Sequence, residues 1–90
     1  MLKHLNITIT GKVQGVFFRA HTLEEAKKYH ISGFVRNEPN GKVYIEAEGE
    51  SEPLSHFLEW CGIGPEKSSV ESIQIEEGPI CDLSGFEIRK

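Results

Sequence analysis

One stretch, Gly11-Lys12-Val13-Gln14-Gly15-Val16-Phe17-Phe18-Arg19, joins two segments of different periodicity. Residues 5–10 before it alternate between apolar and polar side chains, which predicts a strand with one face on the core. Residues 20–30 after it carry a helical pattern, with Ala20, Leu23, Ala26 and His30 as the expected apolar stripe. The quoted stretch is therefore predicted to be a strand-to-helix connection.

This connection has the features of an anion-binding loop. Gly11 and Gly15 allow a tight turn and bring bare backbone close to a ligand. The amides at the start of the following helix lack intrahelical partners, and the helix dipole favours an anion there. Arg19 adds a charged fork of donors that suits phosphate or carboxylate. Glycine-rich turns are also common in purely structural connections, so the spacing alone leaves both interpretations open.

The remaining elements follow from local patterns. Two extended runs at 34–38 and 42–48 flank Pro39-Asn40-Gly41, a strong hairpin signal. A helix is expected from Ser51-Glu52-Pro53 to just before Gly62, because Leu54, Phe57, Leu58 and Cys61 are spaced i, i+3, i+4 and i+7. Further strands are expected at 70–76 and 86–88. This order predicts an α+β ferredoxin-like sandwich, βαββαβ, with two helices on one face of a mainly antiparallel sheet and a short C-terminal strand.

A second motif, Gly33-Phe34-Val35-Arg36-Asn37, makes the interpretation of the loop more specific. Together the two motifs resemble the acylphosphatase family, which has a Gly-x-Val-Gln-Gly-Val-x-Phe-Arg loop and a later Gly-aromatic-Val-basic-Asn strand. The resemblance covers essentially the whole chain and implies the same ferredoxin-like fold. It also implies hydrolysis of acyl phosphates. Without it, Asn37 would be interpreted as the start of the hairpin or as a solvent-facing residue.

The resemblance assigns roles to individual residues. Arg19 falls on the family's phosphate-binding arginine, and Asn37 falls on its water-positioning asparagine. The family's phosphate cradle corresponds to the backbone amides of Gly15, Val16, Phe17, Phe18 and Arg19.

The chemistry of the residues agrees with an activated substrate. A phosphate ester has a poor alkoxide leaving group, so its hydrolysis usually requires a general acid, a metal or a covalent nucleophile. No metal cluster or nucleophile–base pair can be assigned beside the loop. The carboxylate that leaves an acyl phosphate has a pKa of about 4 and needs little protonation. The leading alternative is a non-catalytic small-ligand or regulatory module on the same fold. An RNA-binding sheet is disfavoured by outward threonine and glutamate side chains. The resemblance also permits a domain of a larger carbamoyl-transfer protein, but the chain is expected to be a free-standing enzyme.

Composition limits the setting in which the protein works. Ninety residues, 38% hydrophobic and 27% charged, predict one domain over residues 1–90. The net charge of −4 argues against nucleic-acid binding. Without a membrane-length apolar run or a signal-like N-terminus, a cytoplasmic monomer acting on a small-molecule acyl phosphate is expected.

Other residues are expected to be structural. Cys61 and Cys81 are expected to be reduced, although a bridge between them stays open. No metal-ligand spacing appears among the histidines and cysteines, so neither a cofactor nor a metal is expected. His21 is expected in solvent, and the remaining histidines show no partner pattern: His4, His30 and His56. Four further expectations are local bonds for Gln14, solvent for Arg36, and core or loop anchoring for Phe17 and Phe18.

Overall fold

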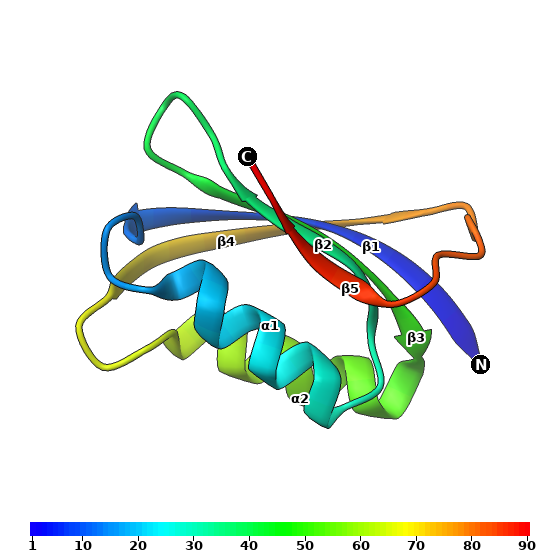
Figure 1. The fold of residues 1–90 in the computed structure, drawn as a ribbon. Coiled ribbons are helices and arrows are strands. Elements are labelled where there is room, and N and C mark those ends of the chain that lie inside the picture. Colours follow the sequence, from blue (N-terminus) through cyan, green and yellow to red (C-terminus); the bar gives the residue numbers. More distant parts are fainter.

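Two helices cover one face of a five-stranded sheet in the computed structural model, which describes residues 1–90 (Figure 1). The elements are β1 (Leu2–Lys12), α1 (Phe18–Lys28), β2 (Ser32–Asn37), β3 (Val43–Glu50), α2 (Ser51–Ile63), β4 (Ser69–Gly78) and β5 (Phe86–Arg89). The strand order is β4-β1-β3-β2-β5, and β2–β5 is the one parallel pair. The predicted fold class is confirmed. Neither helix combines the length and the apolar character that crossing a membrane requires.

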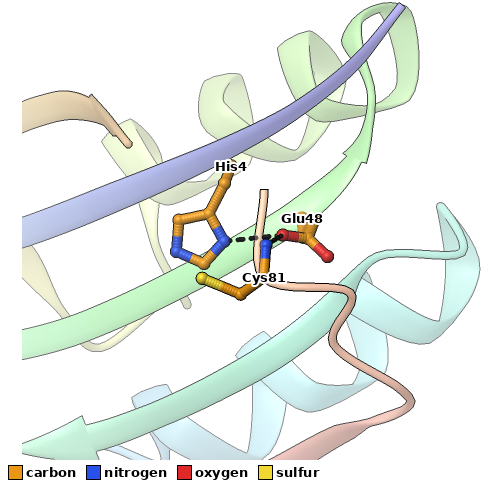
Figure 2. Close-up of side chains that lie close together, drawn as sticks. All are labelled: His4, Glu48 and Cys81. Atoms are coloured by element: carbon orange, nitrogen blue, oxygen red, sulfur yellow. Dashed lines mark hydrogen bonds and ion pairs between the residues drawn. The ribbon is translucent and has the colours of Figure 1, made fainter. Parts of the chain in front are cut away.

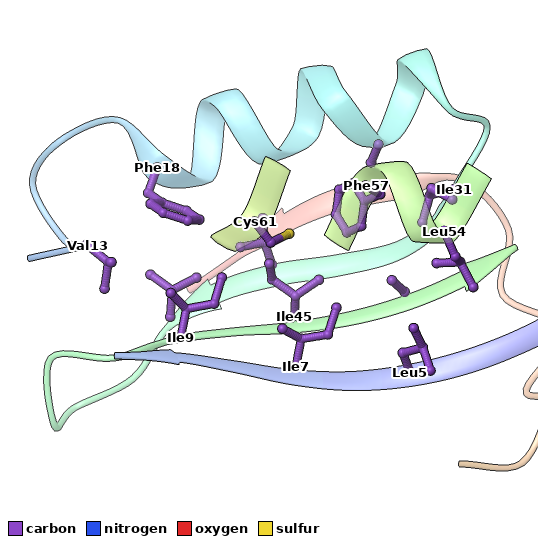
Figure 3. Packing of buried hydrophobic residues seen from close by; sticks show 14 of the residues in the cluster. Leu5, Ile7, Ile9, Val13, Phe18, Ile31, Ile45, Leu54, Phe57 and Cys61 are labelled. Carbon is purple, nitrogen blue, oxygen red and sulfur yellow. The ribbon is translucent and has the colours of Figure 1, made fainter. Parts of the chain in front are cut away.

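The core lies between the sheet and the two helices. The alternating residues of β1, Leu5, Ile7 and Ile9, all point into it, as predicted. From α2, Phe57 and Cys61 are fully buried above the sheet, and Figure 3 shows them facing the isoleucines of β1 and β3. Burial of each large apolar side chain contributes roughly 1.5–3 kcal/mol, so this layer fixes α2 on the sheet.

The first helix differs from its predicted register. It begins at Phe18, preceded by Phe17 in the left-handed conformation, and its buried residues are Phe18, Thr22 and Ala26. Thr22 is tolerated in the core because its hydroxyl donates a hydrogen bond to the carbonyl of Phe18 at 2.7 Å. Ala20 and His30 are exposed, so the prediction of an apolar stripe through them was wrong.

A polar cluster occupies the sheet face that carries no helix. His4 of β1 lies 2.9 Å from Glu48 through Nδ1 and 3.0 Å from Glu46 through Nε2, so it does have partners, contrary to prediction. Burial disfavours the charged imidazolium, but the hydrogen bonds to Glu48 and Glu46 outweigh it and raise the pKa of His4. Glu48 in turn accepts the backbone N–H groups of Cys81 and Leu83 at 2.7 and 2.8 Å. The connection between β4 and β5 is thereby fastened to the sheet.

The pKa of Glu48 reflects the same contacts. Its burial favours the neutral acid, but the Cys81 amide, His4 and the Leu83 amide together lower the pKa below its ordinary value. Cys61 and Cys81 are both free thiols, the first buried and the second exposed.

Candidate functional site

A pocket of about 320 Å³ lies where the loop after β1 and the start of α1 meet the end of β2 and β5. It brings together the two side chains expected to do the chemistry, Arg19 and Asn37. The other lining residues are Val13, Gly15, Phe17, Phe18, Ala20 and Ile88. Val16 contributes to the loop backbone, but its side chain is buried in the core and does not line the pocket.

Two left-handed residues shape the loop, Gly15 with φ 72° and Phe17 with φ 62°. For a residue with a side chain this conformation costs roughly 1–2 kcal/mol. The cost is tolerated because Val13, Val16 and Phe18 anchor the loop in the core. The Phe17 side chain itself is 76% exposed, so its predicted anchoring role was wrong, whereas that of Phe18 is confirmed.

The loop presents a run of unpaired amides. None of the backbone N–H groups from Gly15 to Arg19 donates to a backbone carbonyl, and the first helical donor is His21, which bonds to Phe17 at 3.1 Å. Such amides, at the positive end of a helix dipole, are a ready-made anion site. The structure leaves these amides available as donors, and phosphate binding by them stays a prediction.

Gln14 ties this loop to the β2–β3 hairpin. Its Nε2 donates to the carbonyl of Glu38 at 2.8 Å and to that of Lys42 at 2.9 Å. The expectation of local hydrogen bonds was wrong, because both acceptors lie more than twenty residues away in the sequence. The two bonds fix the amide cradle relative to Asn37, which immediately precedes Glu38 at the end of β2.

Asn37 carries an unusual polar atom. It alternates with the buried Val35 along β2, so its side chain lies on the helix side of the sheet. Its Oδ1 is buried without any hydrogen-bond partner, and no other buried side-chain polar atom of the protein shares this property. Leaving a buried polar group unsatisfied costs roughly 1–3 kcal/mol. A group held at such a cost beside an anion cradle is well placed to bind a water molecule or a substrate atom.

Arg19 is an unpaired cation in the pocket lining. It lies in the first turn of α1, is partly buried, and takes part in none of the ion pairs of the protein. The lining holds no carboxylate that would compete for it. The pocket is therefore locally positive although the whole chain carries a net charge of −4.

The lining residues offer no side-chain acid, base or nucleophile. None is Asp, Glu, His, Cys, Ser, Thr, Lys or Tyr. His21 is exposed and does not line the pocket, and Arg36 pairs with Glu38 at 3.2 Å on the opposite sheet face. The pocket can therefore bind an anion and orient a water molecule, but its side chains cannot themselves attack or protonate a substrate.

Two other features lie far from this pocket. A more open hollow of about 620 Å³ forms between the end of α1 and the start of α2, where the Met1 N-terminus and Lys28 lie beside Glu50 and Glu52. His4, Glu48 and Cys81 gather metal-ligand atoms at the opposite end of β1. At about 3.3 Å per residue, the eight positions from His4 to Lys12 span roughly 26 Å. Neither feature contributes to the pocket.

Comparison with known proteins agrees with this geometry. A sequence profile of the acylphosphatase family matches residues 5–88. The chain is 44% identical over 89 residues to an acylphosphatase of Syntrophus aciditrophicus, covering 98% of this chain and 93% of the relative. It is 41% identical to an acylphosphatase of Rubrobacter xylanophilus, covering 97% and 80%. The crystal structure of acylphosphatase from Bacillus subtilis superposes with a TM-score of 0.95 at 35% identity, covering 100% of both chains.

Proposed function

Since the chain belongs to the acylphosphatase family, we propose that it hydrolyses the carboxyl-phosphate bond of acyl phosphates in the pocket that holds Arg19 and Asn37. Family membership favours this activity over non-catalytic ligand binding. One observation carries the assignment of the site: an unpaired arginine, a row of unpaired amides and a partnerless asparagine oxygen converge on one pocket.

The phosphoryl group is bound first. The Arg19 guanidinium donates two parallel hydrogen bonds to two phosphoryl oxygens. The amides of Gly15, Val16, Phe17, Phe18 and Arg19 donate to the remaining oxygen charge. These donors are already in place before the substrate arrives, so they stabilise the transferring phosphoryl group with little reorganisation.

Attack by water then completes the reaction. Oδ1 of Asn37 accepts a hydrogen bond from a water molecule and aligns the oxygen lone pair with phosphorus. A new P–O bond forms as the bond from phosphorus to the carboxyl oxygen breaks. The carboxylate leaves with both electrons and without protonation, because its pKa is about 4. A phosphoryl oxygen takes the proton of the attacking water, since no lining side chain serves as a base.

The test compares two leaving groups on purified protein. Release of inorganic phosphate is followed from acetyl phosphate and, separately, from p-nitrophenyl phosphate, each with and without a chelator. The proposal predicts rapid, chelator-resistant turnover of acetyl phosphate and little turnover of the ester. Equal turnover of both substrates would contradict the leaving-group argument. Loss of activity on chelation from protein that stays folded and keeps its melting temperature, restored by a divalent ion, would show that a metal takes part in the reaction.

The setting of the enzyme is part of the same proposal. We place residues 1–90 as one domain that acts as a cytoplasmic monomer, without a nucleic-acid partner or a cofactor. Two free thiols, one of them exposed, suit a reducing compartment. The acidic balance of the chain disfavours binding to a phosphate backbone. Light scattering coupled to gel filtration measures the oligomeric state, and cell fractionation measures the location.

A further inference from the structure

Three ligand types meet on the open face of the sheet, well away from the pocket. His4 comes from β1, Glu48 from β3, and Cys81 from the connection to β5. One donor atom from each lies within 4.8 Å of the other two. Figure 2 shows the Cys81 sulfur beside the imidazole ring, with the Glu48 carboxylate next to it. No sequence spacing reveals this group, because its members are brought together only by strand pairing and by the connection.

The distances suit a small metal ion. Zinc binds sulfur at about 2.3 Å and nitrogen or oxygen at about 2.0–2.2 Å, which places tetrahedral donor atoms roughly 3.4 Å apart. Nδ1 of His4 and Oε2 of Glu48 are 2.9 Å apart and need to separate only slightly. The Cys81 thiol is exposed, and its hydrogen bond to the Pro79 carbonyl at 3.4 Å uses the weak S–H donor, so the thiol can turn inward at little cost.

The surroundings hold these ligands in place before any ion binds. Nε2 of His4 bonds to Glu46, whose other oxygen accepts the Tyr44 hydroxyl at 2.9 Å. A carboxylate on the far nitrogen is the usual support of a metal-bound histidine, since it fixes the ring and its tautomer. The two backbone N–H groups on Glu48 orient its carboxylate in the same way.

We propose that His4 Nδ1, Glu48 Oε2 and Cys81 Sγ form a binding site for one thiophilic divalent cation of the Zn²⁺ class, with water as a fourth ligand. A thiolate with an imidazole selects such an ion over Mg²⁺ or Ca²⁺, which prefer oxygen ligands alone. His4 and Glu48 are buried and Cys81 is exposed, so the thiol side gives the ion its entry path. On binding, the ion replaces the proton shared by His4 Nδ1 and Glu48 Oε2, and this proton and that of the Cys81 thiol are both released to solvent.

This site would stabilise the fold rather than take part in catalysis. A bound ion links β1, β3 and the connection that leads into β5, and β5 supplies Ile88 to the pocket wall. The ion itself would lie too far from Arg19 and Asn37 to touch substrate. The inference does not depend on the proposed activity, because binding and stability are measured without substrate.

Cobalt provides the most specific test. Reduced, metal-free protein is titrated with Co²⁺, and the thiolate-to-cobalt charge-transfer absorption is recorded; Zn²⁺ affinity is measured by calorimetry. We expect one ion per chain, a charge-transfer band, and a higher melting temperature with Zn²⁺ but not with Mg²⁺. Cys81→Ser should abolish the band and weaken Zn²⁺ binding at least about tenfold, because loss of even an outer-shell partner typically costs about 10–100-fold in metal affinity.

Matched variants separate the site from incidental binding. Cys61→Ala removes the other thiol, which is fully buried, and should leave the cobalt band unchanged. His56→Gln removes an exposed histidine outside the cluster and should leave Zn²⁺ affinity unchanged. His4→Gln should also weaken Zn²⁺ binding. If the His4→Gln protein unfolds, Cys81→Ser still tests the site, because Cys81 is exposed and its substitution should leave the fold intact. Absence of the band in wild-type protein, or Zn²⁺ binding that Cys81→Ser leaves intact, would overturn the proposal.

Discussion

Asn37→Ala should separate activity from stability. The substitution removes the one buried side-chain polar atom that lacks a partner. Leaving such an atom unsatisfied costs roughly 1–3 kcal/mol, and this cost disappears in the variant. Some packing is lost with the amide, but the loss is limited because the side chain borders a pocket and is only partly buried. We therefore expect the free energy of unfolding to stay the same or to rise by about 1 kcal/mol.

The same substitution should strongly reduce turnover. In the proposed mechanism, loss of the Oδ1 acceptor leaves the attacking water unaligned, and removal of one such group typically lowers kcat by about 10²–10³-fold. This corresponds to roughly 2.7–4 kcal/mol of the activation free energy. Thermal or urea unfolding measures stability, where 1 kcal/mol corresponds to about 4–8 °C in Tm for a domain of this size. Phosphate release from acetyl phosphate measures kcat.

Asn40→Ala is the matched control. Asn40 lies in the neighbouring hairpin turn and is exposed, and its Oδ1 accepts the Lys42 amide at 3.1 Å. Its loss should weaken the turn slightly and leave kcat unchanged. The reasoning about Asn37 is refuted if a folded Asn37→Ala protein keeps near-normal turnover. It is equally refuted if the variant loses more than about 2 kcal/mol of stability, because Asn37 would then be a structural residue.

Two other substitutions test the frame around the pocket. Gln14→Ala deletes both hydrogen bonds to the hairpin, so the free energy of unfolding measured in urea should fall by about 1–3 kcal/mol. The value of kcat should also fall, because the loop loses its alignment with Asn37. Unchanged kcat would mean that the two bonds do not position the loop. Cys61→Ser places a hydroxyl at a fully buried position and should lower the free energy of unfolding by roughly 1–3 kcal/mol, while kcat per folded molecule stays constant. A stable but inactive protein would point to a role for the thiol in catalysis.

Local patterns in the sequence were sufficient to predict the fold. The alternation in β1 and the i, i+3, i+4, i+7 spacing in α2 each determine which face is buried, and the structure confirms both. The predicted register of α1 was wrong because of the local backbone conformation at its start. A helix start with Phe17 in a left-handed conformation carries no residue signal, since glycine is the usual occupant of that region. Burial of Thr22 was not predicted either, because its hydroxyl donates to the Phe18 carbonyl one helical turn earlier.

Contacts between distant residues could not be predicted in the same way. Arg19 and Asn37 were singled out by family motifs, and the structure places both in one pocket. The two bonds of Gln14 depend on how closely the hairpin approaches the loop. The pairing of His4 with Glu48 depends on the antiparallel register of β1 and β3, which puts these two residues directly opposite each other. The sequence contained the residues but no signal for that register.

The affinity of Arg19→Gln for inorganic phosphate tests the central claim most directly. Phosphate is measured as a competitive inhibitor of acetyl phosphate hydrolysis, or by calorimetry where turnover is too low. Each charge-assisted hydrogen bond contributes roughly 1.5–3 kcal/mol, so the loss of even one of the two proposed bonds should make phosphate bind at least about 10–150-fold more weakly to Arg19→Gln. Asn37→Ala, which retains the cradle, and Arg36→Gln, on the opposite sheet face, should bind it as the wild type does. If Arg19→Gln binds phosphate normally, the anion site is not the loop from Gly15 to Arg19.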